Sequence, residues 1–155
     1  MARAGRAAGA TPPARTFSFP HRDASGRVVS MVELTTVALV GIVIALAAVV
    51  VVDGITSLLG LGDFGGASGW LTLILPGLIF FDDLRAWAGY SIRFVVAIVG
   101  AAAAIGVGLV VASLANSWPP VISGALGAAA AVIVYSPIWY FGVRWLTGDS
   151  HGEAA

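Results

Sequence analysis

The chain of 155 residues contains no cysteine and no lysine, and its only histidines are His21 and His151. The absence of cysteine excludes disulfides, thiolate metal sites and cysteine nucleophiles, and it leaves the redox compartment undetermined. Both histidines lie outside the long apolar runs, so no imidazole is available within those runs to bind haem or to relay protons. We therefore expect no cofactor and no metal site.

Charged residues are also scarce. They make up 10% of the chain, whereas hydrophobic residues make up 59% and the mean hydropathy is +0.96; soluble domains are about 25% charged and roughly 45–50% apolar. This composition predicts an all-α integral membrane protein. The formal net charge is zero, which gives no reason to expect nucleic acid as a partner. The expected partners are membrane lipids, together with a membrane or cytoplasmic protein or further copies of the chain.

The first thirty residues are rich in Ala, Gly, Arg and Pro and have no apolar periodicity. They predict a disordered basic tail over residues 1–30. The apolar run that follows begins too late for a secretory signal and is long enough to span a membrane. Met31 directly precedes this run and is an alternative start of translation. At the other end of the chain, we expect a short polar tail over residues 148–155.

Between the tails, residues 31–147 predict one transmembrane domain of four helices. Glu33 suits the first turn of the first helix, where the helix dipole favours a carboxylate, and Asp53-Gly54 is a charged terminator. The second helix is short, because uninterrupted apolar sequence covers only Trp70–Phe81 and Pro76-Gly77 interrupts it; a re-entrant segment is the alternative. The predicted spans cover about 32–52, 66–81, 92–114 and 121–143.

The arginines favour a full crossing by this second helix. If it crosses, all eight basic residues fall on one side of the membrane, as the bias of arginine toward short cytoplasmic loops requires. Both termini are then cytoplasmic, with Trp70 and Trp118 at the outer boundary. The exclusive use of arginine, beside abundant Ala, Gly and Val, suits a GC-rich genome, so we expect the plasma membrane of a bacterium.

Small residues recur along the last two predicted helices. Because no hydrophobic effect draws helices together within a bilayer, small residues that let two backbones approach are a common means of packing. We expect the third and fourth helices to form a tight hairpin through two such ridges. The ridge residues are Gly100, Ala104, Gly108 and Ala112 in the third helix, and Gly124, Gly127, Ala128 and Ala131 in the fourth.

Acidic and basic residues cluster only in the connection between the second and third spans, at Asp82, Asp83, Arg85 and Arg93. Paired aspartates can hold a divalent cation that binds phosphate, but enzymes of that kind carry several more aspartates at fixed helical spacing. We interpret this connection as a solvated interfacial loop and a candidate contact for a protein partner.

These features predict a non-enzymatic membrane protein, in the role of an accessory subunit, scaffold or anchor for a partner protein. The alternative is a holin-like or pore-forming oligomer, or a small transporter. A water-filled path needs a polar or charged stripe along a span. The predicted spans carry only isolated hydroxyl groups, which favours the first hypothesis.

Overall fold

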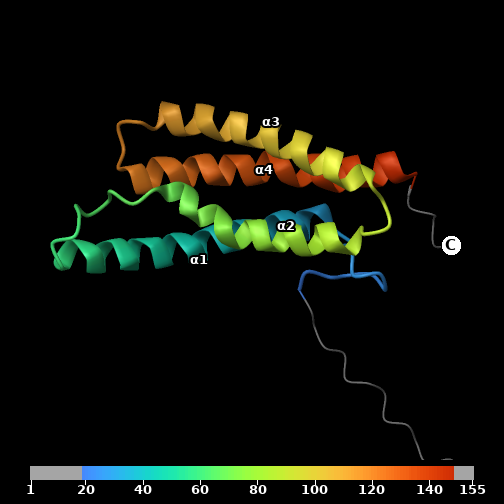
Figure 1. The fold of residues 1–155 in the computed structure, drawn as a ribbon, viewed down its shortest axis with the longest axis horizontal. Helices are drawn as coiled ribbons and strands as arrows, with labels where there is room; N and C mark the ends of the chain where they lie inside the picture. Colours follow the sequence, from blue (N-terminus) through green and yellow to red (C-terminus); the bar gives the residue numbers. More distant parts are fainter. Residues whose placement is uncertain (1–18, 149–155) are drawn as a thin grey trace, which may run out of the picture.

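The computed structural model describes residues 19–148, apart from the side chain of Thr147, and the remainder of the predicted tails lies outside the described residues. Consecutive helices run in alternate directions (Figure 1), so residues 59–68 and 115–119 lie at one end of the bundle and residues 87–91 lie at the other. Within the described range the elements are α1 (Met31–Leu58), the 3₁₀ helix η1 (Gly69–Leu73), α2 (Ile74–Ala86), α3 (Ile92–Leu114) and α4 (Pro120–Thr147).

Three of these helices, α1, α3 and α4, are long and apolar enough to cross a membrane. They are the helices of a multi-pass membrane protein. By length and composition, three single helices qualify where four were predicted, because the segment predicted to span over 66–81 divides into η1 and α2. The helix α2 has 13 residues, which is too short for a hydrocarbon core of about 30 Å at about 1.5 Å per residue.

Pro76 explains where this segment divides. It is the third residue of α2 and lies in the first turn, where a backbone N–H has no acceptor within the helix. Proline lacks this N–H, so its presence there costs little. The preceding residues form the tighter η1 instead, and the Thr72 hydroxyl donates to the Gly69 carbonyl at 2.7 Å. At its other end α2 continues through Asp82 and Asp83, beyond the predicted boundary.

The first and last helices, α1 and α4, are longer than predicted. The Ser30 hydroxyl caps the start of α1 by accepting from the Glu33 N–H. The helix then passes Asp53 and ends before Gly60, which has φ +71°, a conformation that favours glycine. Gly148, with φ +67°, ends α4 in the same way.

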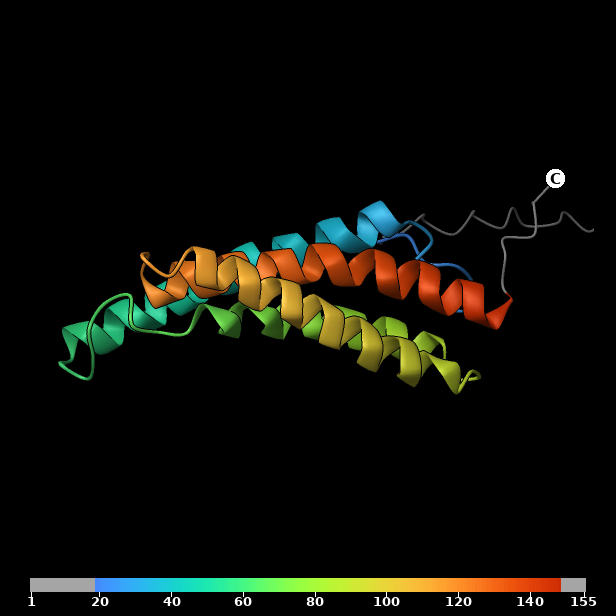
Figure 2. The ribbon, with the colours of Figure 1, turned by 90° about the horizontal axis from the view of Figure 1, so that it is seen from above.

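The centre of the bundle is α4, which contacts α1, α3 and η1, whereas α3 packs mainly on α4. The view in Figure 2 shows α3 and α4 crossing at a shallow angle. Buried residues of α3, at Val96, Gly100, Ala104 and Gly108, recur every fourth position, so one stripe of this helix faces α4. The other faces of α3 expose large apolar side chains, as a lipid environment permits.

Residues 19–30, here called the N-terminal segment, are folded where a disordered tail was predicted. Arg22 and Val28 form an isolated antiparallel bridge. The Asp23 carboxylate accepts from the backbone N–H groups of Ser25 and Arg27, both at 2.9 Å. Val28 is 1% exposed and belongs to the hydrophobic core with residues of α1, α2 and α4. The segment is ordered because these helices supply its contacts.

Candidate functional site

The described arginines gather at the end of the bundle where the N-terminal segment meets α2 and α4. Their side chains contact residues of that segment, of α2 or of the helix ends beside it. We call this region the arginine end. Its arginines are Arg22, Arg27, Arg85, Arg93 and Arg144.

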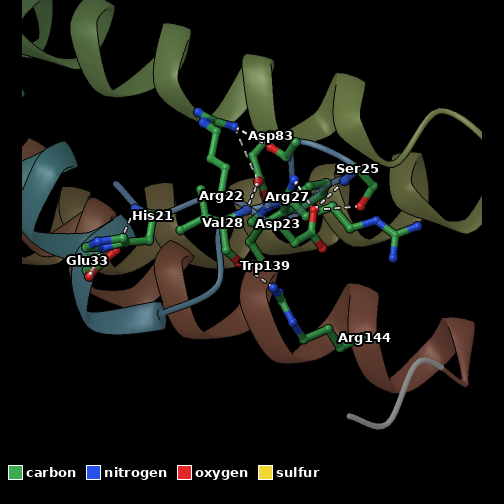
Figure 3. Close-up of polar contacts among 11 residues, drawn as sticks. His21, Arg22, Asp23, Ser25, Arg27, Val28, Glu33, Asp83, Trp139 and Arg144 are labelled. Atoms are coloured by element: carbon green, nitrogen blue, oxygen red, sulfur yellow. Dashed lines mark hydrogen bonds and ion pairs between the residues drawn. The ribbon is translucent and has the colours of Figure 1, made fainter. Parts of the chain in front are cut away.

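Asp83 lies at the centre of the arginine end and is 1% exposed. Its carboxylate accepts a hydrogen bond from the backbone N–H of Val28 at 3.0 Å and another from the indole N–H of Trp139 at 2.7 Å. The Arg22 guanidinium lies 4.0 Å from the same carboxylate. Figure 3 shows these side chains converging from the N-terminal segment, α2 and α4. A buried carboxylate is costly unless it is paired and hydrogen-bonded, so these contacts stabilise Asp83 in this position.

Two arginines and two aromatic rings add a second layer of contacts. The Arg27 guanidinium lies 3.9 Å from the centroid of the Trp87 ring, and that of Arg144 lies 3.7 Å from the centroid of Tyr140. Arg144 also donates to the carbonyl of Val28. The distances from Arg27 to Trp87 and from Arg144 to Tyr140 are in the range of cation–π interactions. The contacts join α4 and the end of α2 to the N-terminal segment independently of Asp83.

A hydrogen-bonded turn shapes the exposed part of the N-terminal segment. Desolvation of the Asp23 carboxyl raises its pKa, but hydrogen bonds from Ser25 and Arg27 outweigh this effect and hold the pKa below its ordinary value. His21 fastens the start of the segment to α1. Its backbone N–H donates to the Glu33 carboxylate at 2.7 Å, and its ring Nδ1 lies 2.8 Å from the other carboxylate oxygen.

The structure divides the predicted partner-contact loop. Asp82, Asp83 and Arg85 lie on α2 rather than in a loop. Asp83 is buried against its own chain and is not available to a partner, which corrects the prediction that it is solvated. Arg93 is half-buried and donates to the Leu84 carbonyl at 3.0 Å. Only Asp82 and Arg85 of the four side chains are exposed.

The structure brings part of the two predicted small-residue ridges together. A Cβ built on Gly108 would lie 2.6 Å from the Gly127 carbonyl oxygen and 3.2 Å from the Ala131 Cβ. One built on Gly127 would lie 3.0 Å from the Ala112 Cβ. Ala104 is 2% exposed. At these positions α3 and α4 are in backbone contact, which a larger side chain would prevent.

Other ridge residues have different neighbours. Gly124 faces Gly69 of η1 instead of α3, with the two backbones so close that a Cβ on Gly124 would lie 2.9 Å from the Gly69 Cα. Gly100 faces the side chains of Tyr135 and Ile138. Ala128 is fully buried in the hydrophobic core. The predicted ridge of α4 therefore serves two neighbouring elements.

Sequence reasoning missed Gly69 and Trp70 as packing residues. A Cβ on Gly69 would lie 2.1 Å from the Val121 carbonyl oxygen, so only glycine fits between η1 and α4. The Trp70 ring, predicted at the membrane boundary, reaches the crossing of α3 and α4, where a Cβ on Gly108 would lie 2.9 Å from it. The sequence contains no periodic signal for either residue, because η1 supplies them outside any long helix.

At the opposite end of the bundle, Asp53 is the second buried carboxylate. It is 7% exposed and accepts hydrogen bonds from the backbone N–H groups of Gly65 and Ala67. Asp53 thus holds the connection between α1 and η1, residues 59–68, against α1, and the helix does not end at this residue. Among residues 19–148, no group of three or more His, Cys, Asp or Glu side chains is placed to hold a metal ion. Both buried carboxylates fasten one part of the chain to another.

Comparison of the chain with protein families, curated proteins and solved structures finds no match. Its function must therefore be argued from the contacts described above. What the arrangement offers is a folded polar surface at the arginine end, fixed on a bundle whose lateral faces are apolar. Such a surface is suited to binding, and its buried carboxylate, that of Asp83, is engaged in contacts within the chain.

Proposed function

We propose that the protein is a non-enzymatic accessory subunit, scaffold or anchor that holds a partner protein at the membrane. The observation that carries this proposal is the way the N-terminal segment is fastened across α2 and α4 by Asp83, Arg27 and Arg144. Ordering a polar segment costs conformational entropy, and a preorganised surface lowers the ordering cost of binding a partner. A fixed surface at the arginine end is therefore suited to recognition.

We propose in addition that η1 and α2 together form a fourth crossing, with both termini in the cytoplasm. Their combined length is about 30 Å at about 2.0 Å per 3₁₀ residue and about 1.5 Å per α-helical residue, close to the thickness of a hydrocarbon core. This crossing places the described arginines on one side and Asp53 and Asp63 on the other, in agreement with the positive-inside bias. The proposed location is the plasma membrane, in a bacterium the inner membrane.

The alternative is a holin-like or pore-forming oligomer, or a small transporter. A conducting path needs polar groups along its length. Two clefts among the described residues, of about 300 and 530 Å³, are lined almost wholly by apolar side chains. The buried hydroxyls of Thr72 and Ser136 donate to carbonyls of their own helices. These observations favour the binding role over conduction.

Purification from membranes in mild detergent, with quantification of what accompanies the protein, tests the binding role. We expect a partner in a fixed ratio. We expect the partner to present a basic group to the exposed Asp82. Charge reversal of Asp82 to Arg should then reduce recovery of the partner by about tenfold, since a like-charge contact costs about one or more kcal/mol at an interface. Asp63→Arg, the same change at the opposite end of the bundle, is the matched control. A bare homo-oligomer that conducts ions in liposomes would instead establish the alternative.

A further inference from the structure

An apolar groove of about 300 Å³ opens between α2 and α3, with α4 as its floor. Its walls include Gly77, Phe81 and Leu84 of α2, and Ala101 and Ala104 of α3. In a soluble protein such a groove would be a conventional ligand site. In a bilayer it faces hydrocarbon, so its occupant must be apolar along most of its length.

The end of the groove distinguishes between possible occupants, because two guanidinium groups contact its lining residues there. The Arg85 guanidinium lies 4.5 Å from the centroid of the Phe81 ring. Arg93 donates to the carbonyl of Leu84 at 3.0 Å through one terminal nitrogen. Its Nε–H is buried and has no hydrogen-bond partner among the described residues. An apolar slot that ends beside two cations is complementary in shape and charge to an anionic lipid.

We infer that this groove is a binding site for an anionic phospholipid, with one acyl chain between α2 and α3 and the phosphate at Arg85 and Arg93. Arginine is well suited to phosphate, because its planar fork of donors matches two phosphate oxygens. Asp82, the nearest exposed acid in sequence, forms no ion pair with Arg85 or Arg93 among the described residues. Asp82 is the residue after Phe81, and successive residues of an α-helix point about 100° apart. The Asp82 side chain therefore lies on the side of α2 away from Gly77 and Leu84, which line the groove. The phosphate end of this site shares Arg85 and Arg93 with the arginine end, whereas its acyl-chain part between α2 and α3 does not depend on the proposed protein partner.

Native mass spectrometry of delipidated protein tests the chain-binding part of the site. The probes are dioleoyl phosphatidylglycerol and dioleoyl phosphatidylcholine, which share their acyl chains and differ in net charge. Gly77→Leu fills the groove, and a Cβ built on Gly77 would have no neighbouring atom within 4 Å. Gly106→Leu is the matched control, since Gly106 is equally open but does not line the groove. We expect Gly77→Leu to weaken phosphatidylglycerol binding by about tenfold or more relative to the control, because leucine displaces several methylene groups of the chain.

Arg85→Gln tests the headgroup part. We expect the wild type to bind phosphatidylglycerol more tightly than phosphatidylcholine, by about fivefold for each arginine that contacts the phosphate. Arg85→Gln should lose the part of this preference that is due to Arg85, while its affinity for phosphatidylcholine is unchanged. Asp82→Asn should leave the preference as it is or increase it slightly. Equal affinity of the Gly77→Leu and Gly106→Leu variants for phosphatidylglycerol would overturn the inference, as would an unchanged preference in Arg85→Gln. Loss of a bound polypeptide in Gly77→Leu with lipid binding intact would assign the groove to a partner helix instead.

Discussion

Gly108→Leu probes the closest approach of α3 to α4. Even the first carbon of a side chain at this position would lie 2.6 Å from the Gly127 carbonyl oxygen and 2.9 Å from the Trp70 ring. A comfortable carbon–oxygen contact is about 3.3 Å or longer, so the added carbon is roughly 0.7 Å too close. The carbonyl oxygen belongs to the backbone of α4 and cannot move alone, so the two helices must separate.

Separation removes the dispersion contacts along the crossing and the weak Cα–H hydrogen bonds between the helices. These are the main attractions between helices where no hydrophobic effect acts. Overpacking of a core costs about 1–3 kcal/mol, and we expect a loss of unfolding free energy in this range. For a chain of this length about 1 kcal/mol corresponds to a shift of about 2–4 °C, so the thermal midpoint in detergent should fall by roughly 2–12 °C.

Gly106→Leu is the control, two residues away on the same helix. A Cβ at Gly106 meets no atom within 4 Å, and both substitutions gain the same helix propensity, because both replace glycine by leucine. The difference between the two midpoints therefore isolates packing. Thermal unfolding followed by light scattering gives both values. Equal midpoints would show that the crossing at Gly108 contributes nothing to stability and would refute the reasoning.

Three further predictions concern topology and the arginine end. Because the chain has no native cysteine, single cysteines can be labelled cleanly: one at Ser68 should react from outside the cell and one at Ser91 only after permeabilisation, and outside labelling at Ser91 would contradict four crossings. Asp83→Asn keeps one acceptor oxygen but not two, so it should cost about 1–3 kcal/mol and expose the N-terminal segment to trypsin, whereas Asp82→Asn should change neither property. The pKa of Asp23 is held below 3.8 in the folded chain, so its turn should be stabilised above that pH and lose this contribution as the pH falls through the folded-state pKa; persistence of the Ser25 amide shift in NMR spectra at still lower pH would contradict this.

The membrane class and most helix positions follow from the sequence because hydropathy and periodicity are local properties. Apolar runs of the right length, separated by charged or glycine-rich connections, identify the three long helices. The fourfold spacing of Gly100, Ala104 and Gly108 likewise identifies the stripe of α3 that is buried in the structure. A helix presents residues three or four apart on one face wherever it packs. Such features depend on neighbours in the chain and can be predicted without knowledge of the fold.

Features that depend on distant residues were predicted incorrectly or not at all. Residues 19–30 have the composition of a disordered tail, but Val28 is held by Asp83, 55 residues away, and Tyr140 donates to the Val29 carbonyl from 111 residues away. Asp83 has the sequence context of a surface residue, but contacts with residues distant in sequence make it the most buried acid of the arginine end. The positions of Asp83 and of residues 19–30 depend on contacts that exist only once the helices have assembled.

The choice of neighbour for each small residue also depended on tertiary structure. From spacing alone, Gly124 belongs with Gly127 on one ridge toward α3; in the fold, Gly124 meets Gly69, whereas Gly127 meets Gly108. Periodicity defines the direction in which a residue points around its own helix, but not which element occupies that direction. The short η1, which no periodic pattern predicts, fills the space beside Gly124 and inserts Trp70 at the crossing. Thus the sequence by itself determined the three long helices and the stripe that α3 buries, and the packing of the assembled chain decided what each face contacts.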